Sequence, residues 1–368
     1  MWSYAPFVCA ALAACGNDVI FASLRDVDRT FERRNLHSVQ YRAVTSRELE
    51  RLIRAHPADI VYPMTEHLIS LTHDLPAELR ANCFPRWTDF QRKHLEDRRE
   101  LYALVQGSGV KFPEIMNIDR DEDLDRALQR FGLPLVIRGT AGTGGGQVRI
   151  VKSADSLRAA ASELRAVSPD GIFAQRFITG RRCIAAAVCI EGKVSQLITQ
   201  RVLEAYPHDT SPSLVNRSFH SDRLTASAEA VFGLLRWTGF VSTDFIEDDQ
   251  GRFYLLEVNP RIWGSVQVAE VCGVPMFDAF SRLINEQAQL PRRAAQPDRT
   301  VVLFPQYITA RREQGRLFRV NEVLPVLRCL ADAPMSPAGL MRRYARAFAR
   351  RLRGVASTTR QPGAPVNT

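Results

Sequence analysis

Apolar residues follow two different periods over residues 1–92. Helical spacing predicts helices at 5–15 and 46–55, and short runs of branched apolar residues predict strands at 18–23 and 58–62. This alternation is typical of a small α/β domain built on a parallel sheet. Such a domain is expected to open with a strand, but no strand-like run precedes the first predicted helix.

The stretch "MWSYAPFVCAALAACG" has two interpretations. Its apolar run ending at Cys15 imitates a lipoprotein cleavage site, but a signal peptide carries a basic segment and residues 1–14 contain no Lys or Arg. We favour an amphipathic helix that Gly16 ends. Its apolar face would comprise Phe7, Val8, Ala11, Leu12 and Cys15.

Beyond residue 92 the pattern becomes richer in strands. A helix is predicted at 97–109, with Leu101, Leu104 and Val105 facing inward. The further predicted helices are 154–166 and 222–237, and the predicted strands are 134–138, 148–152, 172–177, 183–190, 193–200, 240–247 and 252–259. The strands on either side of Glu191-Gly192 form a predicted hairpin.

Carboxylates interrupt the last predicted hairpin, "FVSTDFIEDDQGRFYLLEVN". If Gln250-Gly251 form the turn, Asp244 lies opposite Glu257, and Asn259 shares their face. Oxygen ligands without Cys or His select a hard ion such as Mg²⁺ or Mn²⁺, which often also binds phosphates. The alternatives are a polar face that meets water, or a four-residue turn that shifts the register by one.

A glycine-rich segment, "RGTAGTGGGQV", lies between two predicted strands. It matches neither the P-loop nor the dinucleotide turn, and we interpret it as a phosphate-covering flap that includes Gly144, Gly145 and Gly146. A plain flexible loop is the alternative. Arg138, the first residue of this segment, could pair with phosphate. Arg98, at a helix N-terminus, needs a compensating anion, either Asp97 or a phosphate.

The composition excludes several classes of protein. The chain has 368 residues, 45% of them hydrophobic, and contains no apolar run of the ~18 residues that a membrane-spanning helix needs. Its seven cysteines form no CxxC pair, so we expect scattered buried thiols and a cytoplasmic protein.

The net charge is +9, and the part of the chain after residue 290 is strongly basic, with 15 arginines against four acids. Residues 340–355 form a predicted basic helix that packs on the body or touches a membrane surface or nucleic acid; we favour packing.

Four segments in order resemble the ATP-grasp superfamily, in particular carbamoyl-phosphate-synthase-like and carboxylate–amine ligase members. They are "EDRRELYALVQGSGVKFPE", "PLVIRGTAGTGGGQVRIV", "IFAQRFITG" and "STDFIEDDQGRFYLLEVNPRIWGS". The resemblance covers roughly residues 90–285. It implies an α/β (α+β) ATP-grasp fold, with an N-terminal pre-ATP-grasp parallel α/β domain and a two-part ATP-binding domain.

The resemblance divides the chain into four parts. The pre-ATP-grasp domain would occupy 1–92, and the ATP-grasp domain 93–290, with a flap subdomain at about 112–178. A basic extension (291–354) and a disordered tail (355–368) would follow.

The resemblance also assigns roles to residues. Asp244, Glu257 and Asn259 fall on the Mg²⁺ (or Mn²⁺) ligands, and Arg98 and Arg138 fall on the two basic phosphate anchors. Backbone near Gln175 and Phe177 would hold the adenine of ATP, and Arg261 would contact the transferred phosphate. Three residues depart from the pattern at positions where the family usually carries acids: Arg176 in the hinge, and Arg181 and Arg182 at the ribose.

The implied activity is ligation. A substrate carboxylate would attack the γ-phosphate of ATP, and an amine or thiol would then displace phosphate from the acyl phosphate. Small-molecule acids and amines would be the partners, and a homodimer fits the resemblance. Arg201 and Trp263 are candidates for contacting the substrate; the alternatives are surface charge for Arg201 and core packing for Trp263. The alternatives are a nucleotide-binding regulatory protein without catalysis and a basic protein that binds membranes or nucleic acid.

Overall fold

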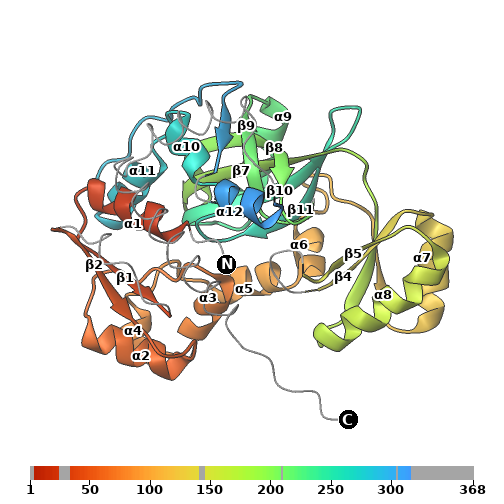
Figure 1. Ribbon diagram of the computed structural model, residues 1–368, viewed down its shortest axis with the longest axis horizontal. Coiled ribbons are helices and arrows are strands. Elements are labelled where there is room, and N and C mark those ends of the chain that lie inside the picture. The colour runs from red at the N-terminus through yellow and green to blue at the C-terminus, as the bar shows by residue number, and fades with distance from the viewer. Residues whose placement is uncertain (1–3, 25–33, 141–145, 209, 304–305, 316–368) are drawn as a thin grey trace, which may run out of the picture.

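The computed structural model describes residues 4–24, 34–140, 146–208, 210–303 and 306–315. Figure 1 shows three regions: an N-terminal unit in red and orange, a six-stranded sheet with its helices in green and blue, and a smaller lobe in yellow and lime. The helices α5 and α6 lie between the N-terminal unit and the smaller lobe. The predicted mixed α/β fold class is confirmed.

The N-terminal unit is built on the parallel pair β1 and β2. Its elements are α1 (Ala5–Ala14), β1 (Val19–Ser23), β2 (Leu36–Gln40), α2 (Ser46–Ala55), α3 (Glu66–Thr72) and α4 (Ala77–Arg80). The predicted strand at 58–62 is wrong, because only Val61 forms a bridge, to Cys83. The next residue, Tyr62, instead stacks on Phe84 and packs edge-on against Phe280.

Helix α1 forms as predicted, but it is buried on two sides rather than one. Phe7 packs edge-on against Phe277 of the large body, whereas Cys9 and Ala13 pack against Leu36 of β2. The expected amphipathic face is therefore incomplete, because the helix is held between the N-terminal sheet and the large body. Gly16 ends it with a φ of +89°, which only glycine adopts readily.

Two consecutive helices connect the N-terminal unit to the rest: α5 (Asp89–Glu96) and α6 (Arg98–Val105). Asp97 separates them and caps α6 by accepting from the Arg99 backbone N–H at 2.8 Å. The predicted helix at 97–109 is thus four residues too long at its C-terminal end. Gln106 turns to extended geometry, and Gly107 has a φ of +82°.

The smaller lobe is a four-stranded sheet in the order β3-β6-β4-β5, with two helices. Its elements are β3 (Ile115–Ile118), α7 (Asp121–Phe131), β4 (Leu135–Gly139), β5 (Val148–Val151), α8 (Ala154–Val167) and β6 (Ile172–Arg176). Leu124 and Leu164, one from each helix, lie in the core of this lobe. A Cβ on Gly139 would lie 2.3 Å from Oε1 of Gln147 and 2.5 Å from Oγ of Ser168, so a larger residue there would displace these two side chains.

The large antiparallel sheet has the order β11-β10-β7-β8-β9-β12. Its strands are β7 (Arg181–Ile190), β8 (Lys193–Ala205), β9 (Ser213–Ser218), β10 (Gly239–Glu247), β11 (Phe253–Asn259) and β12 (Thr300–Val302). The helices nearby are α9 (Asp222–Leu234), α10 (Gln267–Val271), α11 (Met276–Ile284) and α12 (Gln306–Glu313). The predicted hairpin at Glu191-Gly192 is confirmed, since Ile190 pairs with Lys193.

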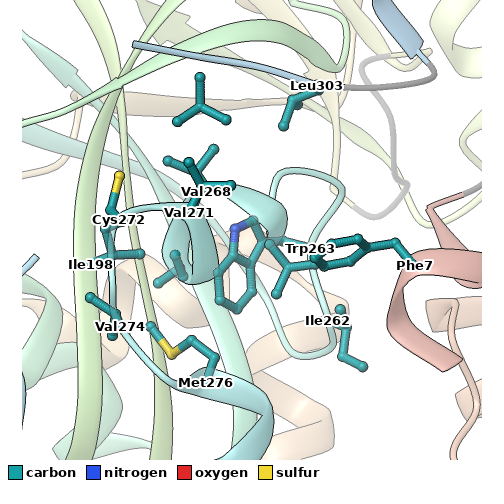
Figure 2. Close-up of a cluster of buried hydrophobic side chains, with 14 of the residues drawn as sticks. Phe7, Ile198, Ile262, Trp263, Val268, Val271, Cys272, Val274, Met276 and Leu303 are labelled. Atoms are coloured by element: carbon teal, nitrogen blue, oxygen red, sulfur yellow. The ribbon is translucent and has the colours of Figure 1, made fainter. Parts of the chain in front are cut away.

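Both faces of this sheet are buried. On β7, Ala185 and Ala187 face the core formed with α6 and α9, whereas Ala186 and Val188 face the core formed with α1, α10 and α11. Strands covered on both faces read as continuous apolar runs, which is why "CIAAAVCI" shows no alternation. Figure 2 shows part of the second core, around Trp263.

The described cysteines fit the expectation of scattered buried thiols. All six are free, and five of them are buried. Burial raises the pKa of Cys9 and of Cys183 to about 12. Among the described residues, no helix has the length and apolar character needed to cross a bilayer. Cys329, the predicted helix at 340–355 and the predicted tail at 355–368 lie outside the described residues.

One buried carboxyl predicts a pH-dependent stability. Burial raises the pKa of Glu270 from 4.5 to about 7, although the Phe277 backbone N–H donates to it at 3.1 Å. The folded state therefore binds this proton more tightly than the unfolded state, and the resulting stability is lost as the pH rises through 7. Relative to Glu270→Gln, we expect the free energy of unfolding of the native chain to fall by roughly 2–3 kcal/mol from about pH 5 to about pH 8.

Urea unfolding of the native chain and of Glu270→Gln at both pH values measures this difference. A difference between the two proteins that stays constant with pH would contradict the assignment.

Candidate active site

The acidic hairpin β10–β11 brings the three predicted ion ligands together. Asp244 pairs with Glu257, and Ser242 pairs with Asn259, as the predicted register requires. The predicted two-residue turn is wrong, because the strands already separate at Glu247 and Phe253 and a five-residue connection joins them. A bulge after Asp244 shifts the register by one and restores the Asp244–Glu257 pair.

Glu257 is the point where three elements meet. Its Oε2 accepts from Arg98 Nη2 at 3.1 Å and lies 3.4 Å from Arg138 Nη2. Arg98 is the first residue of α6, and Arg138 lies on β4 of the smaller sheet. The anion that compensates Arg98 is therefore Glu257, whereas Asp97 pairs with Arg99. The two predicted phosphate anchors and the central predicted ion ligand form one cluster.

Asp244 and Asn259 extend this cluster along the hairpin. Asn259 Nδ2 donates to Asp244 Oδ2 at 3.2 Å and lies 3.5 Å from Glu257 Oε1. Arg182 of β7 donates through Nε to Asp244 Oδ1 at 3.1 Å. Each carboxylate therefore has an arginine on its outer side, and the asparagine amide lies between the two.

The environment drives the two carboxyl pKa values apart. Burial raises the pKa of Asp244, and the Glu257 charge adds to this while Arg182 opposes it. Burial also acts to raise the pKa of Glu257, but the charges of Arg98 and Arg138 outweigh it and bring the value down to about 2. Glu257 is therefore ionised at neutral pH, as a ligand of a hard cation must be.

The donor set fits a divalent ion. Asp244 Oδ2 and Glu257 Oε1 face the same amide group, and a half turn of that group about Cβ–Cγ would present Asn259 Oδ1 in place of Nδ2. Three hard oxygens would then converge. Among the described residues, no cluster of three or more His, Cys, Asp or Glu offers an alternative metal site.

Arg261 directly follows the hairpin and is held by the N-terminal unit. Its Nε lies 2.7 Å from Oε1 of Glu66, the first residue of α3. Both side chains are about one-fifth exposed, at 18% and 20%. The hydroxyl of Tyr4 donates to the Ile262 carbonyl at 2.8 Å, and the hydroxyl of Tyr62 accepts from the Ile262 N–H at 3.1 Å. Three residues of the N-terminal unit thus fix this segment.

The predicted hinge runs from β6 of the smaller sheet into β7 of the large sheet. Gln175 is buried, and its side chain donates to the Tyr102 hydroxyl at 2.9 Å. Phe177 is the first residue after β6 and is partly buried. Arg176 pairs with Glu114 at 2.8 Å and lies over the ring of Phe131, so it belongs to the outer side of this lobe.

Two predicted substrate residues lie in other environments. Trp263 is only 4% exposed and packs with Phe7, Ile262 and Val268 in the core (Figure 2), which favours core packing over contact with a substrate. Arg201 forms two hydrogen bonds with Glu247, at 3.0 and 3.1 Å, and lies over the Phe219 ring, which commits its charge to a local pair.

The remaining predicted site residues lie in or beside the glycine-rich segment. Gly144 and Gly145 are outside the described residues, and their predicted contact with phosphate stays a prediction. Gly146 is described, and a Cβ there would meet nothing within 4 Å.

The sequence did not reveal Glu66, Tyr4 and Tyr62 as site residues. They lie about 200 or more positions before Arg261 and carry no motif, so only the fold places them. The one available signal was Glu66 itself, an acid directly after the N-cap Thr65. Arg182 was noticed only as a departure from the ribose pattern, and its contact with Asp244 was not expected.

The two sheets, with an acidic hairpin in one and a glycine-rich strand connection in the other, form the ATP-grasp fold. Residues 97–291 match the family described as "Carbamoyl-phosphate synthase L chain, ATP binding domain". This match covers more than half of the chain, and the protein belongs to that family.

Curated relatives show similarity over part of their length. Pyruvate carboxylase of Schizosaccharomyces pombe is 26% identical over 179 residues, which is 44% of this chain and 15% of that protein. N5-carboxyaminoimidazole ribonucleotide synthase of Vibrio parahaemolyticus is 27% identical over 222 residues, 53% of this chain and 56% of that protein. The chain therefore spans about half of the second relative and far less of the first.

Solved structures agree on the fold. The biotin carboxylase of Campylobacter jejuni, in a structure described as a β-γ-ATP complex, has a TM-score of 0.66 and 16% sequence identity. The similarity covers 79% of this chain and 70% of that chain. It therefore extends beyond the region of the family match and includes part of the N-terminal unit.

The contact between Glu66 and Arg261 leads to a prediction. If Glu66 positions Arg261, Glu66→Gln should lower ATP-dependent turnover by about 10–100-fold, the range seen when a group supporting a site residue is removed. Nucleotide affinity should change little, because Glu66 does not contact Arg98 or Arg138 in the described structure. Steady-state ADP release and nucleotide titration measure the two effects.

The matched control is Glu78→Gln on the neighbouring helix α4, where an exposed glutamate pairs with Arg54 at 3.2 Å. It should retain full turnover. Equal losses in both variants would argue against a positioning role for Glu66.

Proposed function

We propose that this protein is an ATP- and Mg²⁺-dependent ligase. It joins a carboxylate to an amine or a thiol through an acyl phosphate and releases ADP and phosphate. One observation carries the proposal: Arg98, Arg138 and Asn259, from three separate elements, converge on the ionised carboxylate of Glu257. Family membership supports the ATP-binding part, because the matched family is defined as an ATP-binding domain.

Different residues would bind the ion, the phosphates and the adenine. Asp244, Glu257 and Asn259 would hold Mg²⁺, which neutralises phosphate charge when bound. Arg98 and Arg138 would bind the α- and β-phosphates with the glycine-rich segment, and backbone near Gln175 and Phe177 would hold the adenine. Arg138 is only 5% exposed, so its charge would act in surroundings that screen it weakly.

Arg261 would stabilise the charge on the transferred phosphoryl group. It lies directly beyond the acidic hairpin, two residues after Asn259, and Glu66 holds its guanidinium. Burial acts to lower the pKa of Arg261, but Tyr4 and Glu66 raise it above its ordinary value, so the group stays charged. Catalysis in such a site comes from positioning and charge neutralisation rather than from a protein nucleophile.

The other assignments remain predictions. These are the small-molecule acid and amine, a homodimer, a cytoplasmic location and the division of the chain at residues 92 and 290. The same applies to the basic extension after residue 290, most of which lies outside the described residues.

Acyl-phosphate formation can be tested without knowing the amine. Hydroxylamine traps acyl phosphates as hydroxamates, so each candidate acid is incubated with Mg·ATP and hydroxylamine. We expect hydroxamate and ADP in equal amounts for the correct acid, and neither with the Glu257→Gln variant. ADP formation without hydroxamate for every acid would argue for ATP hydrolysis and against a ligase.

A further inference from the structure

Arg182 contacts the carboxylate oxygen of Asp244 that Asn259 does not contact. It lies on β7 opposite Ile246, diagonally across from Asp244, which pairs with Ile184. Diagonal neighbours in an antiparallel sheet lie about 7–8 Å apart, within reach of an arginine. Its Nε reaches Asp244 Oδ1 at 3.1 Å.

A second contact fixes the guanidinium from the opposite side. Arg182 Nη1 donates to the Ser211 carbonyl at 2.6 Å. Ser211 is 2% exposed, and its hydroxyl is bonded to His208 Nδ1 at 2.9 Å. Arg182 is therefore tied both to the ion ligand and to the connection between β8 and β9, and a swing away from Asp244 would break both contacts.

The oxygens of the two carboxylates fall into an inner and an outer pair. Asp244 Oδ2 and Glu257 Oε1 form the inner pair and face the Asn259 amide at 3.2 and 3.5 Å. Asp244 Oδ1 and Glu257 Oε2 form the outer pair, and each accepts from a guanidinium. In the described structure the inner pair consists of the carboxylate oxygens of this cluster that no arginine contacts, and with Asn259 Oδ1 it forms the set offered to a cation.

From this geometry we propose that the site binds a single divalent ion, with Arg182 serving as a fixed cation in place of a second one. The inference rests on the proposed ATP- and Mg²⁺-dependent function and goes beyond it, because it concerns how many ions the nucleotide complex contains. The charge of a guanidinium does not depend on the concentration of free Mg²⁺. We therefore also expect turnover to stop rising with Mg²⁺ once all the ATP is present as Mg·ATP.

Paramagnetic Mn²⁺ provides a readout that does not depend on turnover. The full chain is mixed with one equivalent of an ATP analogue that carries a β,γ-imido bridge and is titrated with Mn²⁺ in an electron paramagnetic resonance experiment. We expect one tightly bound Mn²⁺ per chain, with the spectrum of an isolated ion. Two bound ions with a spin-coupled spectrum in the native chain would overturn the proposal, as would no bound ion at all.

Two variants sharpen the test. Arg182→Gln frees Asp244 Oδ1 and should strengthen binding of a second Mn²⁺ at least about tenfold. Arg181→Gln is the matched control, because Arg181 is 65% exposed and pairs with Glu247 rather than with an ion ligand; it should keep one ion. A second ion that binds equally weakly to Arg182→Gln and to the native chain would contradict the assigned role.

The result for the native chain stands even if Arg182→Gln fails to fold. A native chain that binds two ions and still forms hydroxamate would remove the inference about Arg182 and leave the proposed ligase intact. If the native chain binds one ion but none of the tested acids gives hydroxamate, the inference about Arg182 is supported and the proposed ligase is contradicted.

Discussion

Replacing Glu257 by glutamine should lower ATP-dependent phosphoryl transfer by about 10³-fold or more. Glutamine has nearly the same shape but no charge, so the proposed Mg²⁺ would lose its central anionic ligand. The variant also leaves Arg98 and Arg138 without the carboxylate that both contact. The Glu257 side chain is 25% exposed, so its removal should cost less than the about 3–5 kcal/mol of a fully buried ion pair, and unfolding is measured alongside turnover.

The matched control for Glu257→Gln is Asp248→Asn. Asp248 lies in the connection of the same hairpin and pairs with Arg252 at 2.7 Å, away from the ion ligands. It should lose some stability and keep phosphoryl transfer. Normal ADP release by folded Glu257→Gln would remove Glu257 from the reaction, whereas a large loss in Asp248→Asn would mean that turnover reports only the integrity of the hairpin.

Replacing Arg261 by alanine should reduce turnover by about 10²–10³-fold with little change in nucleotide affinity. A charge that acts mainly on the transferred phosphoryl group stabilises the transition state more than the bound nucleotide. The change also leaves Glu66 without its partner, which should cost about 1–3 kcal/mol of stability.

The double variant Glu66→Gln/Arg261→Ala separates the two effects of this change. It should recover most of the lost stability, because no unpaired charge remains, but it should not recover turnover. Chemical unfolding and ADP release on the two single variants and the double variant complete the cycle. Recovery of turnover in the double variant would mean that Arg261 supports the fold and does not act on phosphate.

The sequence predicted the hairpin that carries the ion ligands and the pairing of Asp244 with Glu257, but it did not predict the turn that joins the two strands. The Asp244–Glu257 pair is correct, although the turn is longer than expected and a bulge after Asp244 compensates for it. Bulges leave little trace in an apolar pattern, because the residue between Leu255 and Glu257 is simply another leucine. Arg98 and Arg138 were identified because each stands at the end of a strongly patterned element.

Contacts between distant segments could not be predicted in the same way. For Trp263 the sequence left open a substrate contact or core packing, and only the fold shows that its ring lies in the core beside Phe7 of α1. No motif marks Glu66, yet it holds Arg261. Such pairings depend on how the N-terminal unit docks against the large sheet, and a periodic pattern describes only the faces of individual elements.

The most direct test of the central claim is Mg·ATP-dependent ADP release, screened over a matrix of carboxylates and amines, with Glu257→Gln measured in parallel. We expect ADP release that requires one acid and one amine together and disappears in the variant. Because the proposed acyl phosphate would form before the amine reacts, the correct acid alone should give at most a single turnover. ADP release that needs no acid, or that continues unchanged in folded Glu257→Gln, would contradict the proposed ligase and its site.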